Sequence, residues 1–212
     1  NGHLPLLRKV GSTGKPVIMS IGMASISEIG EAVEVLKESG CKDLILLKCT
    51  STYPASPIDS NVLTIPHMRQ LFGCQVGLSD HTMGIGTAIS SIAHGATVIE
   101  KHFTINRSEG GVDSAFSIEP HELKQLVIES KNAWESLGKV YYGSTEKEKS
   151  SLIFRRSLYI SEDMKKGEYF SKKNLRIVRP GLGLAPKYIN LFIGRKVKKD
   201  AEKGTPLSWD FI

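Results

Sequence analysis

Two histidines close two short apolar runs of the sequence. QVGLSDHT (75–82) leads to His81, and ATVIEKHF (96–103) leads to His102. If the two runs form neighbouring strands, about 4.8 Å apart, their imidazoles can converge on one ion. A histidine that merely satisfies a strand end is the alternative for either residue alone, but matching places on two strands favour a metal site. With carboxylates nearby, such a pair suits a divalent transition metal such as Mn²⁺; the candidate carboxylates are Asp80, Glu100 and Asp113.

Hydroxyl groups and cations gather at the ends of the same apolar runs. Such groups can hold a phosphate or a carboxylate, although each one alone is more often a strand cap or a loop hydrogen bond. Only their convergence indicates a binding site. The residues are Ser20, Lys48, Thr50, Ser51, Tyr53, Ser79 and Lys101.

A long loop, TINRSEGGVDSAFSI (104–118), follows His102 and contains Gly110-Gly111. Long loops beside functional sites often act as lids. Asp113 in this loop is either a base or ligand that reaches back to the histidines, or a turn residue.

Four strand–helix units must position these residues. The strands are expected at 16–22, 43–50, 75–81 and 96–103, and the last helix at 119–138. Their continuous apolar character predicts a parallel sheet covered on both faces. Polar residues at the strand ends favour a (β/α)₈ TIM barrel, in which function lies at the carboxyl ends of the strands. A doubly wound sheet is the alternative, but no glycine-rich nucleotide loop follows any strand.

Four units cannot close a barrel of eight strands. We therefore expect residues 1–143 to be the C-terminal half of the barrel, with strands 5–8 present and the first four strands preceding this chain. A half-barrel alone would expose its inner face and two unpaired strand edges.

The texture changes after Gly143. A polar linker is expected at 144–152, followed by short β-like runs at 153–212. DMKKGEYFS (163–171) and DAEKGTPLS (200–208) share a pattern at an offset of 37 residues. Two copies predict a small, pseudo-symmetric all-β module, with its glycines in tight turns.

Composition excludes several classes of protein. No apolar stretch approaches the roughly 20 residues of a membrane helix. Three cysteines without metal spacing (Cys41, Cys49 and Cys74) indicate reduced thiols and a cytoplasmic setting. Residues 151–212 carry 14 Lys and Arg against 6 Asp and Glu, a net charge of +8. This region could bind nucleic acid or cover an anionic small-molecule site, and the absence of interleaved aromatics disfavours nucleic acid.

The ordered motifs KPVIMSIGMAS, LLKCTSTYP, VGLSDHT, VIEKHFT, GGVDSAFSIEP, RRSLYI and LRIVRPGLG resemble the sialic acid synthase family over nearly the whole chain. The resemblance implies a TIM barrel followed by a C-terminal antifreeze-like (SAF) domain of the β-clip type. It also implies a transferase that condenses phosphoenolpyruvate with an N-acetylated amino sugar and releases phosphate by C–O cleavage.

The resemblance also implies roles for particular residues. His81 and His102 would bind the divalent metal, Mn²⁺ or Mg²⁺, and Asp113 and Tyr53 would be catalytic. Four residues would line the phosphoenolpyruvate site, namely Ser20, Ser51, Tyr53 and Ser79, although the family commonly has Asn in place of Ser51. Arg179 would reach the partner's sugar in a domain-swapped homodimer. The preceding half-barrel would supply a glutamate and phosphate-binding lysines, so we expect this chain alone to be inactive.

Within the family, VDSAFS and GLGLAPKY are most similar to the pseudaminic acid synthases, which use a 2,4-diacetamido-2,4,6-trideoxy-altrose. Neuraminate synthases tend to have a histidine where this chain has Ser114. Neuraminate and legionaminate synthases remain alternatives, and a metal-dependent TIM-barrel hydrolase is a more distant one. A stand-alone polyanion-binding module at 151–212 would be a non-catalytic reading of the basic region.

Overall fold

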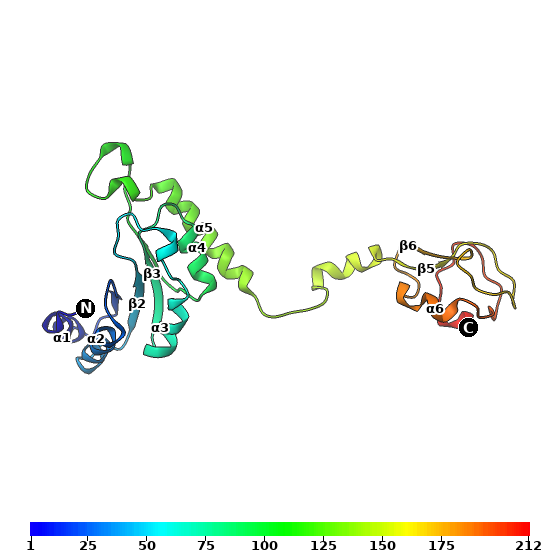
Figure 1. The fold of residues 1–212 in the computed structure, drawn as a ribbon, viewed down its shortest axis with the longest axis horizontal. Helices are drawn as coiled ribbons and strands as arrows, with labels where there is room; N and C mark the ends of the chain where they lie inside the picture. The colour runs from blue at the N-terminus through cyan, green and yellow to red at the C-terminus, as the bar shows by residue number, and fades with distance from the viewer. The chain divides into compact units, whose positions relative to one another are not determined.

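A computed structural model describes all residues, 1–212, and divides them into two compact units, Asn1–Lys139 and Val140–Ile212. The first unit holds a four-stranded parallel sheet in the order β1-β2-β3-β4 (Figure 1). Its strands are β1 (Val17–Ser20), β2 (Leu44–Cys49), β3 (Gln75–Asp80) and β4 (Ile99–Lys101). Its helices are α1 (Leu4–Gly11), α2 (Ile26–Glu38), α3 (Thr64–Phe72), α4 (Gly86–Ala93) and α5 (Pro120–Leu137). Consecutive strands pair in parallel, which confirms the predicted half-barrel of strand–helix units.

The two faces of this sheet have different surroundings. One face, which includes Met19, Leu46 and Leu78, packs against α2 and α3 in the main hydrophobic core. The other face would line the inside of a barrel, and there Ile18 is 56% exposed. Leu47, on the same face of β2, is only 1% exposed, so the predicted exposure of inner-face residues is confirmed at Ile18 on the edge strand, whereas the centre of that face is covered. Both outer edges, on β1 and β4, lack a strand partner.

Local sequence signals set the beginnings of the helices. Ser25 caps α2, and Glu28 accepts a hydrogen bond from the Ser25 backbone in a capping box. Glu119 and Glu122 form the equivalent box at α5, where Pro120 occupies the first turn without losing a helical hydrogen bond. No helix of the structure combines the length and apolar character needed to cross a bilayer.

The second unit contains an antiparallel pair, β5 (Ser157–Ile160) and β6 (Leu175–Val178), and a short helix α6 (Ile189–Phe192). The segment expected to be a linker contains a 3₁₀ helix, Glu146–Phe154, capped by Thr145. The β-like runs around Lys196 and Pro206 form only isolated bridges, to Tyr169 and Tyr159, and the chain ends in a 3₁₀ helix, Trp209–Phe211. The all-β module is thus less regular than its sequence suggests.

The predicted repeat is a pseudo-twofold relation within this unit. Asp163 accepts a hydrogen bond from the backbone N–H of Lys203 (2.7 Å), and Asp200 accepts one from the N–H of Lys166 (2.8 Å). These are equivalent positions exchanged between the two copies. Each aspartate therefore closes the turn of the opposite repeat.

The backbone hydrogen bonds obey the same relation. The N–H of Gly167 donates to Val197 and the N–H of Gly204 donates to Ile160, each over 2.8 Å. Both glycines have positive φ, of +94° and +88°, as the turn prediction requires. Together these bonds enclose a core that includes Phe170 and Phe192.

Candidate functional site

A cavity of about 620 Å³ lies at the carboxyl ends of β1–β4 in the first unit. Side chains from all four strand ends face it because alternate residues of a strand point to the same side of a sheet. Its walls are formed by Asn1, Gly2, Ser20, Ile21, Gly22, Met23, Ala24, Glu28, Cys49, Ser51, Tyr53, Ser79, His81, Glu100 and His102. Seven of the residues singled out by the sequence therefore come together here: Ser20, Ser51, Tyr53, Ser79, His81, Glu100 and His102.

Strand register brings one row of these side chains into line. Cys49 pairs with Ser79, and Ser79 pairs with Glu100. The Ser79 hydroxyl donates a 2.7 Å hydrogen bond to Oε1 of Glu100. A Cβ atom at Gly77 would lie 2.3 Å from the Val98 carbonyl oxygen, so glycine permits β3 and β4 to approach closely. Cys49, Ser79 and Glu100 therefore line the same cavity as the two histidines.

His81 is buried (6% exposed) and held in one orientation. Its Nδ1 lies 2.8 Å from the carbonyl oxygen of Thr50. A carbonyl can only accept a hydrogen bond, so Nδ1 carries the proton in the neutral ring and Nε2 keeps its lone pair. A backbone partner that fixes the tautomer in this way is usual for metal-ligating histidines.

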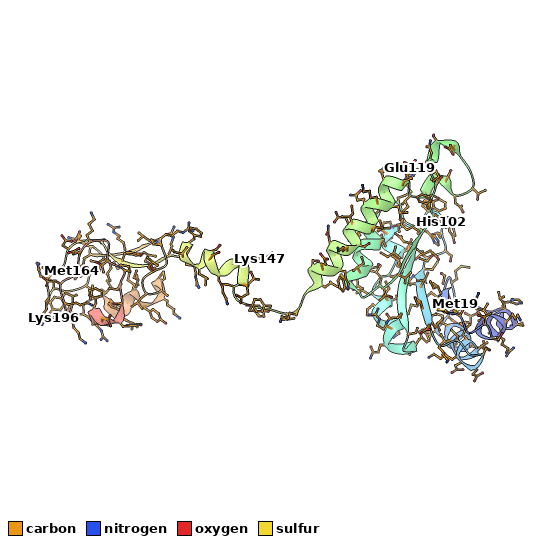
Figure 2. All side chains as sticks on the ribbon, turned by 180° about the vertical axis from the view of Figure 1, so that it is seen from behind. Met19, His102, Glu119, Lys147, Met164 and Lys196 are labelled. Atoms are coloured by element: carbon orange, nitrogen blue, oxygen red, sulfur yellow. The ribbon has the colours of Figure 1, made fainter.

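His102 lies beyond the end of β4, before the loop that leads to Glu119 and α5 (Figure 2). Its ring centroid lies 5.1 Å from that of His81. Asp113, from the loop, brings Oδ2 to 3.7 Å from Nδ1 of His102. Asp113 adopts a left-handed backbone conformation (φ 69°), which aspartate tolerates better than most residues. The loop thus directs a carboxylate toward the second histidine.

Aromatic rings surround this pair. The Tyr53 ring centroid lies 4.3 Å from that of His81 and 5.7 Å from that of His102. The buried Phe116 ring lies 5.1 Å from that of His102 and 5.8 Å from that of Tyr53, so the three rings contact one another. The tilted and edge-on geometries are those that aromatic pairs prefer. Tyr53 itself is 52% exposed, so its hydroxyl end is accessible at the cavity wall.

Two histidines of this cavity could each supply one nitrogen ligand to a single divalent metal ion. His81 offers a free Nε2, and His102 offers a second imidazole across the same wall. Neither His81 nor His102 belongs to a group of three His, Cys, Asp or Glu residues whose ligand atoms all lie within 4.8 Å of one another. The one three-residue group with that spacing is Glu119, His121 and Glu122 at the start of α5, where Arg107 already contacts both glutamates.

Hydroxyl groups complete the cavity. The Oγ atom of Ser20 is buried and has no hydrogen-bond partner within the protein, so it is available to a polar group in the cavity. Ser51 Oγ lies 3.8 Å from Cys49 Sγ. These hydroxyl groups can form hydrogen bonds with an oxygen-rich molecule in the cavity.

Three charged residues expected around the histidines lie elsewhere. Lys48 and Lys101 pair in register with Leu78 and Asp80, on the face turned away from the cavity. Lys101 forms a buried 2.9 Å ion pair with Asp80 and also donates to the Thr82 carbonyl. Neither lysine is available to a phosphate in this cavity, and Asp80 is not available to a metal. Sequence proximity misled the prediction because neighbouring residues of a strand face opposite sides.

Arg179 belongs to the second unit, directly after β6. It lines a cavity of about 410 Å³ together with Arg156, Ile177 and Val178. Two guanidinium groups in one cavity make this an anion-attracting surface of that unit.

Sequence reasoning missed two parts of the site. Cys49 lines the cavity wall, with its Sγ 3.9 Å from Nδ1 of His81, although the sequence assigned this cysteine no place in the site. The Thr50 carbonyl that orients His81 has no side-chain signature and could not have been found from residue types. The pairing of Cys49 with Ser79 was a signal that strand alternation could have supplied.

Comparison with known proteins places the chain. Residues 1–142 match the NeuB family and residues 155–212 match the SAF domain. The chain is 41% identical to a pseudaminic acid synthase of Campylobacter jejuni over 201 residues, covering 95% of this chain and 59% of that protein. It is 38% identical to an N,N'-diacetyllegionaminic acid synthase of the same species, covering 93% of this chain and 60% of that protein.

The fold agrees with a solved relative. The crystal structure of the Bacillus subtilis spore coat polysaccharide biosynthesis protein spsE superposes with a TM-score of 0.61 at 32% identity, covering 99% of this chain and 64% of that one. This chain therefore spans about 60% of the length of the curated relatives it matches. The chain belongs to the NeuB family, with the sialic acid synthase-like half-barrel followed by an SAF domain.

Proposed function

We propose that the protein containing this chain is a nonulosonic acid synthase that condenses phosphoenolpyruvate with the open-chain form of an N-acetylated amino sugar. The observation that carries this proposal is the cavity at the strand ends, where two imidazoles, a carboxylate and three serines converge in a member of the NeuB family. The methylene carbon of phosphoenolpyruvate bonds to the aldehyde carbon of the sugar. Water adds to the enol carbon, and phosphate leaves as its C–O bond breaks.

His81 and His102 would hold the divalent metal, Mn²⁺ or Mg²⁺, His81 through its free Nε2. When bound, this ion would act as a Lewis acid toward the aldehyde oxygen. Ser20, Ser51, Tyr53 and Ser79 would bind phosphoenolpyruvate, with the partnerless Ser20 hydroxyl facing it. Their contribution is positioning and electrostatic stabilisation.

Asp113 is proposed as the group that transfers a proton at the sugar. Tyr53, whose ring lies beside both histidines, is proposed as the second catalytic residue. The 3.7 Å approach of Asp113 to His102 supports this placement. Movement of the loop would bring the carboxylate to the substrate and exclude water.

For the sugar, we propose 2,4-diacetamido-2,4,6-trideoxy-altrose, which would make the product pseudaminic acid, a bacterial surface-glycan precursor. The support is Ser114 after Asp113, where Ser114 is buried and donates to the Gly111 carbonyl over 3.1 Å. The similar identities to a pseudaminic and a legionaminic acid synthase leave the legionaminate and neuraminate precursors as alternative substrates.

The remaining parts of the proposal concern assembly and setting. We propose a domain-swapped homodimer in which Arg179 reaches the partner's sugar, consistent with the charge of +8 over residues 151–212. A cytoplasmic location accords with the three free cysteines.

The test uses this chain joined to the first half of the barrel of the Campylobacter jejuni pseudaminic acid synthase. This fusion, called the barrel-completed protein below, is incubated with Mn²⁺, phosphoenolpyruvate and each candidate sugar, and phosphate release is followed. Release with the diacetamido-altrose sugar alone is expected. Release with N-acetylmannosamine or the legionaminate precursor instead would overturn the proposed specificity and retain the reaction. Metal-dependent hydrolysis without condensation would overturn the reaction and favour the hydrolase.

A further inference from the structure

Lys48 is a half-buried lysine near the end of β2 that the proposed chemistry does not use. It lies opposite Leu78 on the face of the sheet turned away from the cavity, and it forms no ion pair. Burial lowers the pKa of its ammonium because desolvation disfavours the charged form. Burying a cation costs free energy unless hydrogen bonds or an ion pair compensate for its lost hydration.

The ammonium holds the chain where β2 ends. Nζ donates to the carbonyl oxygen of Cys49 over 2.8 Å and to the hydroxyl of Thr50 over 3.3 Å. The Thr50 hydroxyl in turn donates to the Asp59 carbonyl over 3.1 Å. One side chain thus ties the strand end to the far side of the loop, at the 3₁₀ helix Pro57–Asp59.

The same loop holds His81 from two directions. The Thr50 carbonyl accepts the hydrogen bond from Nδ1 of His81 over 2.8 Å. The backbone N–H of Ala55 donates to the carbonyl of His81 over 2.9 Å. Any rotation of the Thr50 peptide would remove the acceptor that keeps the proton on Nδ1 and leaves Nε2 free.

We propose that Lys48 is a positioning residue for His81, acting through the Thr50 peptide to fix the imidazole tautomer and thereby the ligand nitrogen that faces the cavity. The consequence for metal binding rests on the proposed role of His81 as a ligand, whereas the consequence for the tautomer does not. Lys48 reaches neither the cavity nor a substrate there, so it acts only through this chain of hydrogen bonds.

The proposal differs from a purely structural role in what Lys48→Met should do. Methionine fills a similar volume and removes the desolvated charge, so the fold is expected to retain its stability. The Nδ1–H form of His81 should nevertheless lose its dominance. A residue that served only packing or stability would leave the tautomer unchanged.

The experiment records ¹⁵N shifts of the His81 ring by NMR in the wild-type chain and in Lys48→Met, Lys48→Arg, Thr50→Val and Lys42→Met. Thr50→Val removes the relay hydroxyl but keeps the carbonyl, so it provides a second reading should Lys48→Met fail to fold. Lys42→Met is the matched control, since Lys42 is exposed and precedes the same strand. The Nδ1–H form is expected in the wild type and the control, mixed tautomers in Lys48→Met and Thr50→Val, and recovery in Lys48→Arg.

Mn²⁺ affinity, measured by electron paramagnetic resonance in the barrel-completed protein, gives the second readout. Loss of a residue that orients a ligand is expected to weaken binding about 10- to 100-fold. An unchanged tautomer in both Lys48→Met and Thr50→Val would overturn the proposal. If the tautomer shifts but even His81→Ala binds Mn²⁺ as tightly as the wild type, the positioning role stands and the metal role of His81 falls.

Discussion

The two units of the molecule solve the problem of strand edges in opposite ways. The first unit leaves both edges of its parallel sheet without a strand partner and exposes Ile18 on the inner face. The second unit exchanges hydrogen bonds between its two repeats, through Asp163 and Asp200, and encloses its own core. The chemically equipped cavity lies in the open unit. In a barrel, functional groups converge at the ends of parallel strands, and four strands do not close a barrel. The second unit carries no such cavity and closes without further strands.

The largest difference between the units should appear in catalysis. In the barrel-completed protein, His81→Ala or His102→Ala should lower metal-dependent phosphate release by more than about 100-fold, since even residues behind a ligand affect metal sites by 10–100-fold. Asp163→Asn in the second unit, far from any histidine in sequence, is the control and should retain turnover. Full activity in either alanine variant would remove that histidine from the metal site.

Core substitutions should separate the units by stability. Phe170, 1% exposed in the second unit, and Leu46, 0% exposed in the first, are each fully packed. Phe170→Ala should cost about 3–5 kcal/mol and Leu46→Ala about 2–5 kcal/mol of unfolding free energy.

The two tryptophans report on the unfolding of the two units separately, because Trp134 lies in α5 of the first unit and Trp209 in the last 3₁₀ helix of the second. Urea unfolding followed by fluorescence, with Trp134→Phe or Trp209→Phe to isolate each signal, should show Phe170→Ala shifting only the Trp209 transition. A joint shift of both transitions would mean that the units unfold as one.

Acid should weaken the reciprocal turns of the second unit. The backbone N–H of Lys166 and the side chain of Lys165 lower the pKa of Asp200. A lowered folded-state pKa adds stability that is fully present above the unfolded-state value, about 3.9, and is lost as pH falls through the folded-state pKa. The urea concentration at the midpoint of the transition reported by Trp209 should therefore decrease as the pH is lowered below about 4. Asp200→Asn should make this pH dependence less steep. An equally steep pH dependence in the variant would show that other groups carry it.

The smallest effect is expected at the open face. Ile18→Thr should change the unfolding free energy of this chain by no more than about 0.5 kcal/mol, because the side chain is exposed. In the barrel-completed protein the same substitution should cost more, since Ile18 would then line the barrel. Equal costs in urea unfolding of the two proteins would mean that the inner face is not covered on completion.

Much of the fold could be read from the sequence, and parts of the site could not. The continuous apolar runs predicted the parallel units, and the 37-residue repeat predicted the pseudo-symmetry in which Asp163 and Asp200 exchange hydrogen bonds. The convergence of His81 and His102 followed from matching strand ends. The position of Lys101 did not follow, because residue type alone cannot say which face of a strand a cation occupies.

The orientation of His81 was equally hidden. It depends on a backbone carbonyl at Thr50 and on the lysine that holds the strand end, and neither belongs to a recognisable motif. The irregular second unit also departed from expectation, because isolated bridges and turns replaced two of its expected strands. Propensity describes segments, whereas these features arise from contacts between segments distant in sequence.

His81 and His102 are the proposed metal ligands of this cavity. Anomalous diffraction at the manganese edge, from crystals of the barrel-completed protein grown with Mn²⁺, tests this assignment most directly. We expect one strong peak bonded to Nε2 of His81 and to a ring nitrogen of His102. A peak at Glu119, His121 and Glu122 with none between the two histidines would contradict it.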